Sequence, residues 1–314
     1  MPALTPANID NKLAIGGEPI KARQQDTRMT VDVQVNGRGP FHFVVDSGAD
    51  TSAVGLRIAH DLQLPLGTPV ILNGMTDRNI VDRVKLATLT LGPSTIGDLE
   101  LPALREEDLG GDGMIGIDAL VRQRLLMDFE SRLIKVEDAR KPAEHLVDEI
   151  VITARLQHGQ LILTQVRAGG LTLDAVIDTG SEITIGNLAL RDKILSASRT
   201  KDWTISATGV TGKTVDLQLG FVRELRIGSI SLRDVPVAFA DVPPFKVFGL
   251  ADRPALLLGT DILEAFRRVS LDFAARKVRF QLRRCGSEAV TISTTPTASL
   301  TGLSSNGDME VCGQ

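Results

Sequence analysis

The chain has 314 residues, of which 43% are apolar and 24% charged, and its formal net charge is −4. This length suffices for one large domain or two of ordinary size, and the apolar content suffices for a buried core. The net negative charge argues against nucleic acid as the partner. No apolar run approaches the length of a membrane span.

The cysteines and histidines give no indication of a metal site or a nucleophilic centre, so no metal and no cofactor is expected. Cys285 and Cys312 lack metal-site spacing, and the four histidines are scattered. The two cysteines are either free or joined in a disulfide that pins the tail, which would fit an exported protein. The N-terminus lacks the apolar core of a signal peptide. Two locations are compatible with this N-terminus. The protein is either cytoplasmic, or it is periplasmic or exported and its signal has been removed, and the latter is favoured.

The first half of the chain reads as a series of strands. Residues 1–28 are polar and predict an irregular N-terminal arm. Apolar residues alternate with polar ones over 29–35, a turn follows, and an apolar strand over 41–45 leads directly to Asp46. Further strands, a short helix from Ile117 and two closing strands complete a predicted first lobe of residues 29–143.

The same order of elements returns in residues 144–284, which form the predicted second lobe. The offset between equivalent residues is 132 from Asp46 to Asp178 and 144 from Phe129 to Phe273. The offset only increases along the chain, as loop insertions in the second half would produce, so two homologous halves are expected. A Ser/Thr-rich tail, residues 285–314, follows, and its residues 290–292 could add one edge strand.

Each half contains an apolar strand that ends in Asp and a sharp turn. The two sequences are Val44-Val45-Asp46-Ser47-Gly48 and Val176-Ile177-Asp178-Thr179-Gly180. One copy alone is only a turn signal. Two homologous halves, however, pack naturally about a pseudo-two-fold axis, where Asp46 and Asp178 would meet. Adjacent carboxyls share one proton, so the ionised member can activate a water while the protonated member donates to a carbonyl oxygen.

These paired motifs resemble those of the aspartic proteases. The run Asp46-Ser47-Gly48-Ala49-Asp50 is similar to the retroviral form, and the repeated Gly-x-Asp-x-Leu is similar to that of retropepsin-like domains of cellular proteins. The resemblance covers residues 29 to 283. The chain looks like a bacterial single-chain protein with two fused retropepsin-like halves. It implies an all-β fold of two acid-protease β-barrel lobes about a pseudo-two-fold axis, with one short helix per lobe. It also implies a monomer that binds a peptide or protein substrate.

The resemblance further implies roles for individual residues. Asp46 and Asp178 would be the catalytic pair. The active-site loops would be supported by interlocking hydroxyls and by small residues, namely Ser47, Gly48, Thr179, Gly180 and Ser181. Gly116 and Gly259 would lie where a strand passes behind each Asp loop.

Two flaps are expected over the cleft. The chain has no tyrosine, which disfavours the pepsin-type flap and favours two retropepsin-type flaps that are low in packing and mobile. One hairpin is predicted around a two-residue turn at Asn73-Gly74, and the other over residues 207–212. The flap residues would be Asn73, Gly74, Met75, Gly209 and Val210. The alternative is a cleft covered by the first hairpin alone.

Other acidic residues are interpreted as structural. Asp50 and Glu182 are either surface-facing or paired with Arg, and Asp118 and Asp261 are expected to cap the helices that they begin. Ser181 could donate a hydrogen bond to a carboxylate, which would make Asp178 the ionised member of the pair.

Three functional hypotheses follow from the sequence. They are an aspartic endopeptidase, a non-catalytic peptide-binding module on the same fold, and a processing enzyme with few targets. The presence of both Asp motifs favours an active enzyme.

Overall fold

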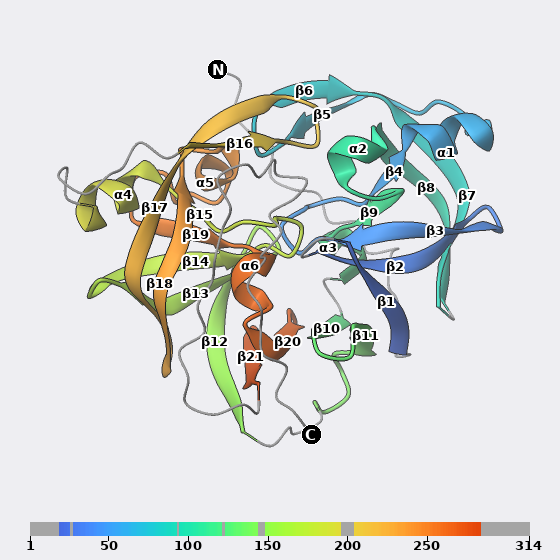
Figure 1. The fold of residues 1–314 in the computed structure, drawn as a ribbon. Helices are drawn as coiled ribbons and strands as arrows, with labels where there is room; N and C mark the ends of the chain where they lie inside the picture. Colours follow the sequence, from blue (N-terminus) through green and yellow to red (C-terminus); the bar gives the residue numbers. More distant parts are fainter. Residues whose placement is uncertain are drawn as a thin grey trace.

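The computed structural model describes residues 19–25, 28–92, 94–120, 123–143, 148–195 and 204–283. Within these residues the chain is built mostly from β-strands arranged in two lobes, one blue to green and the other yellow to red in Figure 1. The predicted all-β, two-lobed fold is therefore confirmed. Cys285, Cys312 and the predicted edge strand at 290–292 lie outside the described residues.

The two halves carry equivalent elements in the same order. The first half contains β1 (Pro19–Gln25), β2 (Arg28–Val35), β3 (Arg38–Val45), β4 (Ala53–Gly55), α1 (Leu56–Asp61), β5 (Val70–Asn73), β6 (Arg78–Val81), β7 (Arg83–Leu91), β8 (Ser94–Leu104), α2 (Glu106–Leu109), β9 (Gly113–Ile115), α3 (Ile117–Leu120), β10 (Gln123–Asp128) and β11 (Leu133–Asp138). The second contains β12 (Glu149–Gln157), β13 (Gln160–Ala168), β14 (Leu171–Ile177), β15 (Ile185–Gly186), α4 (Leu188–Ile194), β16 (Thr204–Thr208), β17 (Thr214–Ile227), β18 (Ile230–Phe239), α5 (Pro243–Val247), β19 (Ala255–Leu258), α6 (Thr260–Leu263), β20 (Phe266–Asp272) and β21 (Lys277–Leu282).

Six strands in each half form a closed circuit of pairings. The circuit is β2–β3–β9–β4–β8–β7 in the first half and β13–β14–β19–β15–β18–β17 in the second. Apolar residues that alternate along these strands point inward, as Val31, Val33 and Val35 of β2 do. Closure leaves neither barrel with an unpaired edge.

Two local predictions are wrong. The expected irregular arm contains β1, which pairs with β2 and β11. Its mostly polar sequence gave no strand pattern, because backbone pairing on both sides holds the strand without alternating apolar residues. Each half also has three short helices rather than one. The additional helices are only four to seven residues long, too short to show a helical period.

A six-stranded antiparallel sheet joins the two lobes in the order β1–β11–β10–β20–β21–β12. Its central pair is β10 and β20, where Leu126 faces Ser270. These two residues are also 144 apart, the offset of the repeat in this region, so the pseudo-two-fold axis passes between them. The sheet therefore sets the two lobes symmetrically about one line.

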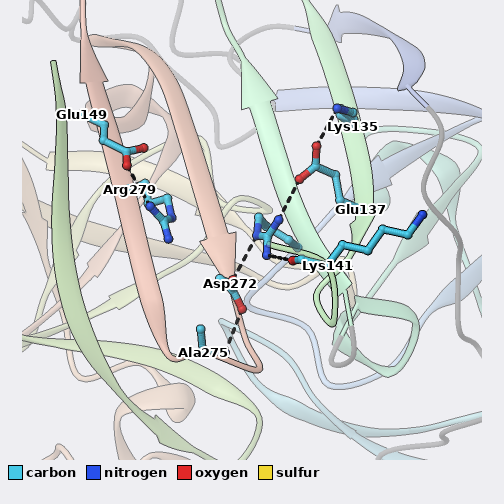
Figure 2. Close-up of polar contacts among 8 residues, drawn as sticks. Lys135, Glu137, Lys141, Glu149, Asp272, Ala275 and Arg279 are labelled. Atoms are coloured by element: carbon cyan, nitrogen blue, oxygen red, sulfur yellow. Dashed lines mark hydrogen bonds and ion pairs between the residues drawn. The ribbon is translucent and has the colours of Figure 1, made fainter. Parts of the chain in front are cut away.

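Buried ion pairs fix the register of this central pair. Arg124 Nε donates to Asp272 Oδ2 at 3.0 Å, and Arg268 makes the equivalent bond to Asp128. Arg124 and Asp272 are only 4% and 2% exposed. The remaining donors of Arg124 bind Glu137 and the carbonyl of Lys141, and Arg279 pairs with Glu149 farther out in the sheet (Figure 2). A slipped register would leave these charges buried without partners, which is expensive.

Candidate active site

Asp46 and Asp178 occupy equivalent positions at the ends of two buried strands. Asp46 follows β3 and Asp178 follows β14. Each of these strands runs parallel to a second strand, β9 or β19, and the Asp backbone N–H donates to the last residue of that second strand. The bonds are Asp46 N–H to Ile115 O at 2.9 Å and Asp178 N–H to Leu258 O at 3.0 Å. Each carboxyl therefore projects from the end of a strand that is paired with a neighbouring strand on both sides.

Reciprocal hydrogen bonds join the two loops. Ser47 N–H donates to Thr179 Oγ1 at 2.9 Å, and Thr179 N–H donates to Ser47 Oγ at 3.2 Å. Each hydroxyl then donates across to the opposite strand, Ser47 to Ile177 O at 3.0 Å and Thr179 to Val45 O at 2.8 Å. Both side chains are 1% exposed. These four hydrogen bonds between the loops place Asp46 and Asp178 side by side.

Glycine is required at four positions around the pair. A Cβ on Gly48 would overlap the carboxyl of Asp178, and a Cβ on Gly180 would overlap that of Asp46. Behind the loops, a Cβ on Gly116 would lie 2.7 Å from the Thr51 carbonyl carbon, and one on Gly259 would lie 2.5 Å from that of Ile183. The glycines therefore allow each loop to lie against the opposite carboxyl and against the strand behind it.

The two carboxyls have unequal surroundings. Asp46 Oδ1 accepts from the N–H groups of Gly48 and Ala49 at 2.7 and 3.0 Å, whereas Asp178 Oδ1 accepts from Gly180 and Ser181 at 3.2 Å each. Burial raises the pKa of both groups. The negative charge of Asp46 raises the pKa of Asp178 further, to about 8, while the two backbone donors and the Arg28 charge oppose the rise at Asp46.

These surroundings favour the proton on Asp178 and the negative charge on Asp46. The premise of the prediction that Asp178 is the ionised member is wrong, because the Ser181 hydroxyl donates to Ile183 O at 2.8 Å instead of to a carboxylate. The position of that hydroxyl depends on the backbone of the next two residues, which the sequence does not reveal.

A cleft lies over the pair and is lined by both predicted hairpins. Its walls include the residues expected on the flaps: Asn73, Gly74, Met75, Gly209 and Val210. The first hairpin turns over Gly74–Asp77, closed by Gly74 N–H to Asp77 O at 2.8 Å, rather than at a two-residue Asn73-Gly74 turn. The second turns over residues 209–213. In Figure 1 the ends of the β5–β6 and β16–β17 hairpins lie next to each other between the two lobes.

The hairpin tips also contact each other and the opposite lobe. Thr211 Oγ1 donates to Asp77 Oδ1 at 2.5 Å. Met75 of the first hairpin packs against an apolar cluster of the second lobe, and Val210 packs against the first-lobe cluster of Ala53, Leu104, Leu109 and Met114. The expectation that both tips are low in packing is therefore wrong at Met75 and Val210. Their mobility stays a prediction.

Two equivalent acidic residues, Asp118 and Asp261, hold the loops from behind. Asp118 accepts from Ser52 N–H and Oγ, and Asp261 accepts from Thr184 N–H and Oγ1, at 2.8 to 2.9 Å. Burial raises the pKa of Asp261 to about 6 and raises that of Asp118 as well. The prediction that these residues cap their helices is wrong for α6, because its N-cap residue is Gly259.

Glu182 and Asp50 both lie in the cleft wall. Glu182 is 1% exposed and forms an ion pair of 2.8 Å with Arg28, which agrees with one of its two predicted environments. Asp50 is half-buried and accepts from Gln160 Nε2 at 3.4 Å. Arg28 and Gln160 were missed because neither lies near an Asp motif. Their offset of 132, the same as that of Asp46 and Asp178, would have identified them as an equivalent pair.

Two observations concern functions for which the sequence gave no support. No group of three or more His, Cys, Asp and Glu side chains suited to a metal ion occurs within the part of the chain that the structure describes. None of the helices in the described residues is long and apolar enough to cross a membrane.

Comparison with known proteins places the chain in a family. No curated protein matches significantly. Among solved structures, the aspartic proteinase from Irpex lacteus matches with a TM-score of 0.50 and 13% sequence identity, covering 86% of this chain and 98% of that one. This likeness concerns the fold. The model of the aspartyl protease family matches residues 31–119 and again residues 164–262, together more than half of the chain. Those two matches cover both Asp loops and both strands behind them, and the chain belongs to the aspartyl protease family.

Proposed function

We propose that this protein is an aspartic endopeptidase that hydrolyses peptide bonds with Asp46 and Asp178 as its catalytic pair. The observation that carries the proposal is the joining of two carboxyls, one from each lobe, by the reciprocal Ser47 and Thr179 bonds beneath a cleft. Membership of the aspartyl protease family supports a protease function in general. Because one chain supplies both halves of the site, a monomer is sufficient for activity.

The roles that we propose for the two carboxyls are based on their unequal environments. Asp46, ionised, takes a proton from a water molecule held between the pair, and that water attacks the peptide carbonyl carbon. Asp178, protonated, donates a hydrogen bond and then its proton to the carbonyl oxygen as negative charge develops there. When the carbon–nitrogen bond of the tetrahedral intermediate breaks, the carboxyl of Asp46 gives its proton to the leaving nitrogen and Asp178 takes back the proton of one hydroxyl, which restores the pair. No covalent intermediate is required.

The two hairpins would close on the substrate. An extended peptide lying between the hairpin tips and the pair can form backbone hydrogen bonds along its length, as in the addition of a strand to a sheet. Closure would also exclude water from the reacting bond. The expected ligand is therefore an extended segment of a peptide or protein.

The test is cleavage of a mixed peptide library by the wild type and by Asp46→Asn and Asp178→Asn. Each substitution is expected to lower kcat at least a thousandfold, because the reaction needs both halves of the acid–base pair. Asp98→Asn is the matched control, since Asp98 is exposed and its backbone φ of 55° suits Asn equally well. Pepstatin should block the wild type.

Peptide binding separates the enzyme from the alternative, a non-catalytic binding module. An enzyme cleaves its peptides in the wild type and only binds them in the two Asn variants. A binding module binds the same peptides in all forms and cleaves them in none. Near-wild-type turnover in Asp46→Asn or Asp178→Asn would refute the shared pair.

A further inference from the structure

The first residues of β2 and β13, Arg28 and Gln160, are equivalent in the repeat and reach across to the opposite lobe. Arg28 Nη2 lies 2.8 Å from Glu182 Oε1. Gln160 Nε2 donates to Gly48 O at 3.1 Å and to Asp50 Oδ1 at 3.4 Å. Asp50 and Glu182 are themselves equivalent, each four residues beyond a catalytic Asp. The same contact between lobes is therefore made twice, once with a cation and once with a neutral amide.

The Arg28–Glu182 contact and the Gln160–Asp50 contact therefore differ in net charge. The Arg28 and Glu182 charges cancel, and both side chains are buried, at 7% and 1% exposed. An amide cannot neutralise the charge of Asp50, and among the described residues Asp50 forms no ion pair within 4 Å. The exposed His158, in the turn before β13, also lowers the pKa of Asp50. Asp50 is also more exposed than Glu182, so a ligand can reach it.

Asp50 and Glu182 lie on opposite sides of the catalytic pair. The pseudo-two-fold axis runs between Asp46 and Asp178, so residues equally spaced beyond each Asp lie on either side of that axis. Both belong to the cleft wall. The remaining charged groups of the wall are Arg28, Asp46, Asp178 and Asp108, and Asp108 pairs with Arg105 at 3.1 Å. An extended peptide would therefore pass a neutralised ion pair on one side and, on the other, a carboxylate without an ion-pair partner among the described residues.

We propose that Asp50 forms an anionic subsite that selects a lysine or arginine side chain of the substrate on one side of the scissile bond. The equivalent position at Glu182 does not select for charge, because Arg28 already occupies it. This inference rests on the proposed endopeptidase function and assigns its substrate a basic residue on one side only. A partly desolvated pair of opposite charges favours the cationic peptide by about tenfold.

The test uses peptides that differ only by lysine or norleucine at one position, placed in turn at each position around the cleaved bond. Both kcat/KM and the affinity of fluorescently labelled peptides are measured for each pair. The assays are run at the highest pH that still supports cleavage, since burial raises the pKa of Asp50. The wild type should prefer lysine by about tenfold at a position on one side, and show no such preference on the other side.

Two variants should abolish this preference in different ways. Asp50→Asn removes the charge and keeps the acceptor for Gln160, while Gln160→Arg supplies the cation that Arg28 supplies on the other side. Both should reduce the lysine to norleucine ratio to within about twofold of one, and the control Asp98→Asn should leave it unchanged. Activity on the norleucine peptide shows that Asp50→Asn remains folded.

The outcomes separate this inference from the proposed function. A lysine preference in binding that is lost in Asp50→Asn, without cleavage of any peptide, would support the subsite and refute the endopeptidase. Cleavage with no lysine preference, with equal preference on both sides, or with a preference that survives in Asp50→Asn would overturn the subsite and leave the endopeptidase standing. Absence of a preference in both binding and cleavage likewise overturns the subsite.

Discussion

Replacement of Thr179 by Val tests the hydrogen bonds that join the two Asp loops. Valine has nearly the same shape as threonine but cannot hydrogen-bond. The change would deprive two groups of a partner, the N–H of Ser47 at 2.9 Å and the carbonyl of Val45 at 2.8 Å. Thr179 is 1% exposed, so water cannot replace the hydroxyl. A buried group left without its partner costs about 1–3 kcal/mol, so the free energy of unfolding should fall by roughly 2–5 kcal/mol.

Calorimetry and urea unfolding measure this loss. A change of 1 kcal/mol shifts the melting temperature of a large domain by about 2–4 °C, so a decrease of roughly 5–15 °C is expected. Thr179→Ser is the control, since it keeps both bonds and removes only a methyl group, and it should lose about 1 kcal/mol. Thr172→Val, on an exposed strand position, controls for the Thr-to-Val change itself.

The activity of Thr179→Val provides a second measure. Asp46 and Asp178 would lose the contact that holds them in register, so kcat should fall more than the affinity for peptide. A Thr179→Val protein as stable as Thr179→Ser would refute the reasoning, because the cross-lobe bonds would then contribute nothing beyond the packing of the side chain.

Two further predictions concern the flaps and the effect of pH. Thr211→Val removes the bond from Thr211 to Asp77 between the hairpin tips; hydrogen exchange in residues 74–77 and 209–213 should become faster and KM should rise several-fold, and unchanged exchange would contradict a closing contact. The pKa of Asp261 is raised to about 6 by burial, so its contribution to stability is fully present below about pH 4 and is lost as the pH rises through 6. The wild type should therefore lose about 3 kcal/mol relative to Asp261→Asn between pH 4 and pH 7; a constant difference in urea unfolding over that range would show that Asp261 does not titrate as proposed.

The sequence was sufficient to predict what repeats at fixed spacing. The two Asp motifs, the strands behind them and the increasing offset between halves indicated two similar lobes meeting at Asp46 and Asp178. The reciprocal placement of Ser47 and Thr179 followed from the resemblance to the aspartic proteases. These features are encoded locally, in turns and apolar strands, and are duplicated, so each copy supports the interpretation of the other.

Features that depend on one distant partner could not be predicted. The polar strand β1 exists because β2 and β11 lie on either side of it. The hydroxyl of Ser181 binds Ile183 O rather than the predicted carboxylate. The first flap turns over four residues despite its Asn-Gly pair, in a hairpin whose tip contacts Thr211 of the other lobe. In each case tertiary contacts overrode a local preference.

The unequal environments of Asp46 and Asp178 depend on both halves being present in one chain. In a symmetric dimer of identical halves the two carboxyls would be equivalent, and the shared proton would have no preferred site. Here Gln160 occupies the position that Arg28 has in the other half, and the charge of Arg28 lowers the pKa of Asp46. The same substitution within the repeat therefore does two things. It places a positive charge that lowers the pKa of Asp46, in addition to the larger effect of the two backbone donors, and it leaves Asp50 without the ion-pair partner that Glu182 has on the other side of the cleft. The proposed direction of proton transfer and the proposed one-sided selection for a basic residue thus share this one difference between the halves.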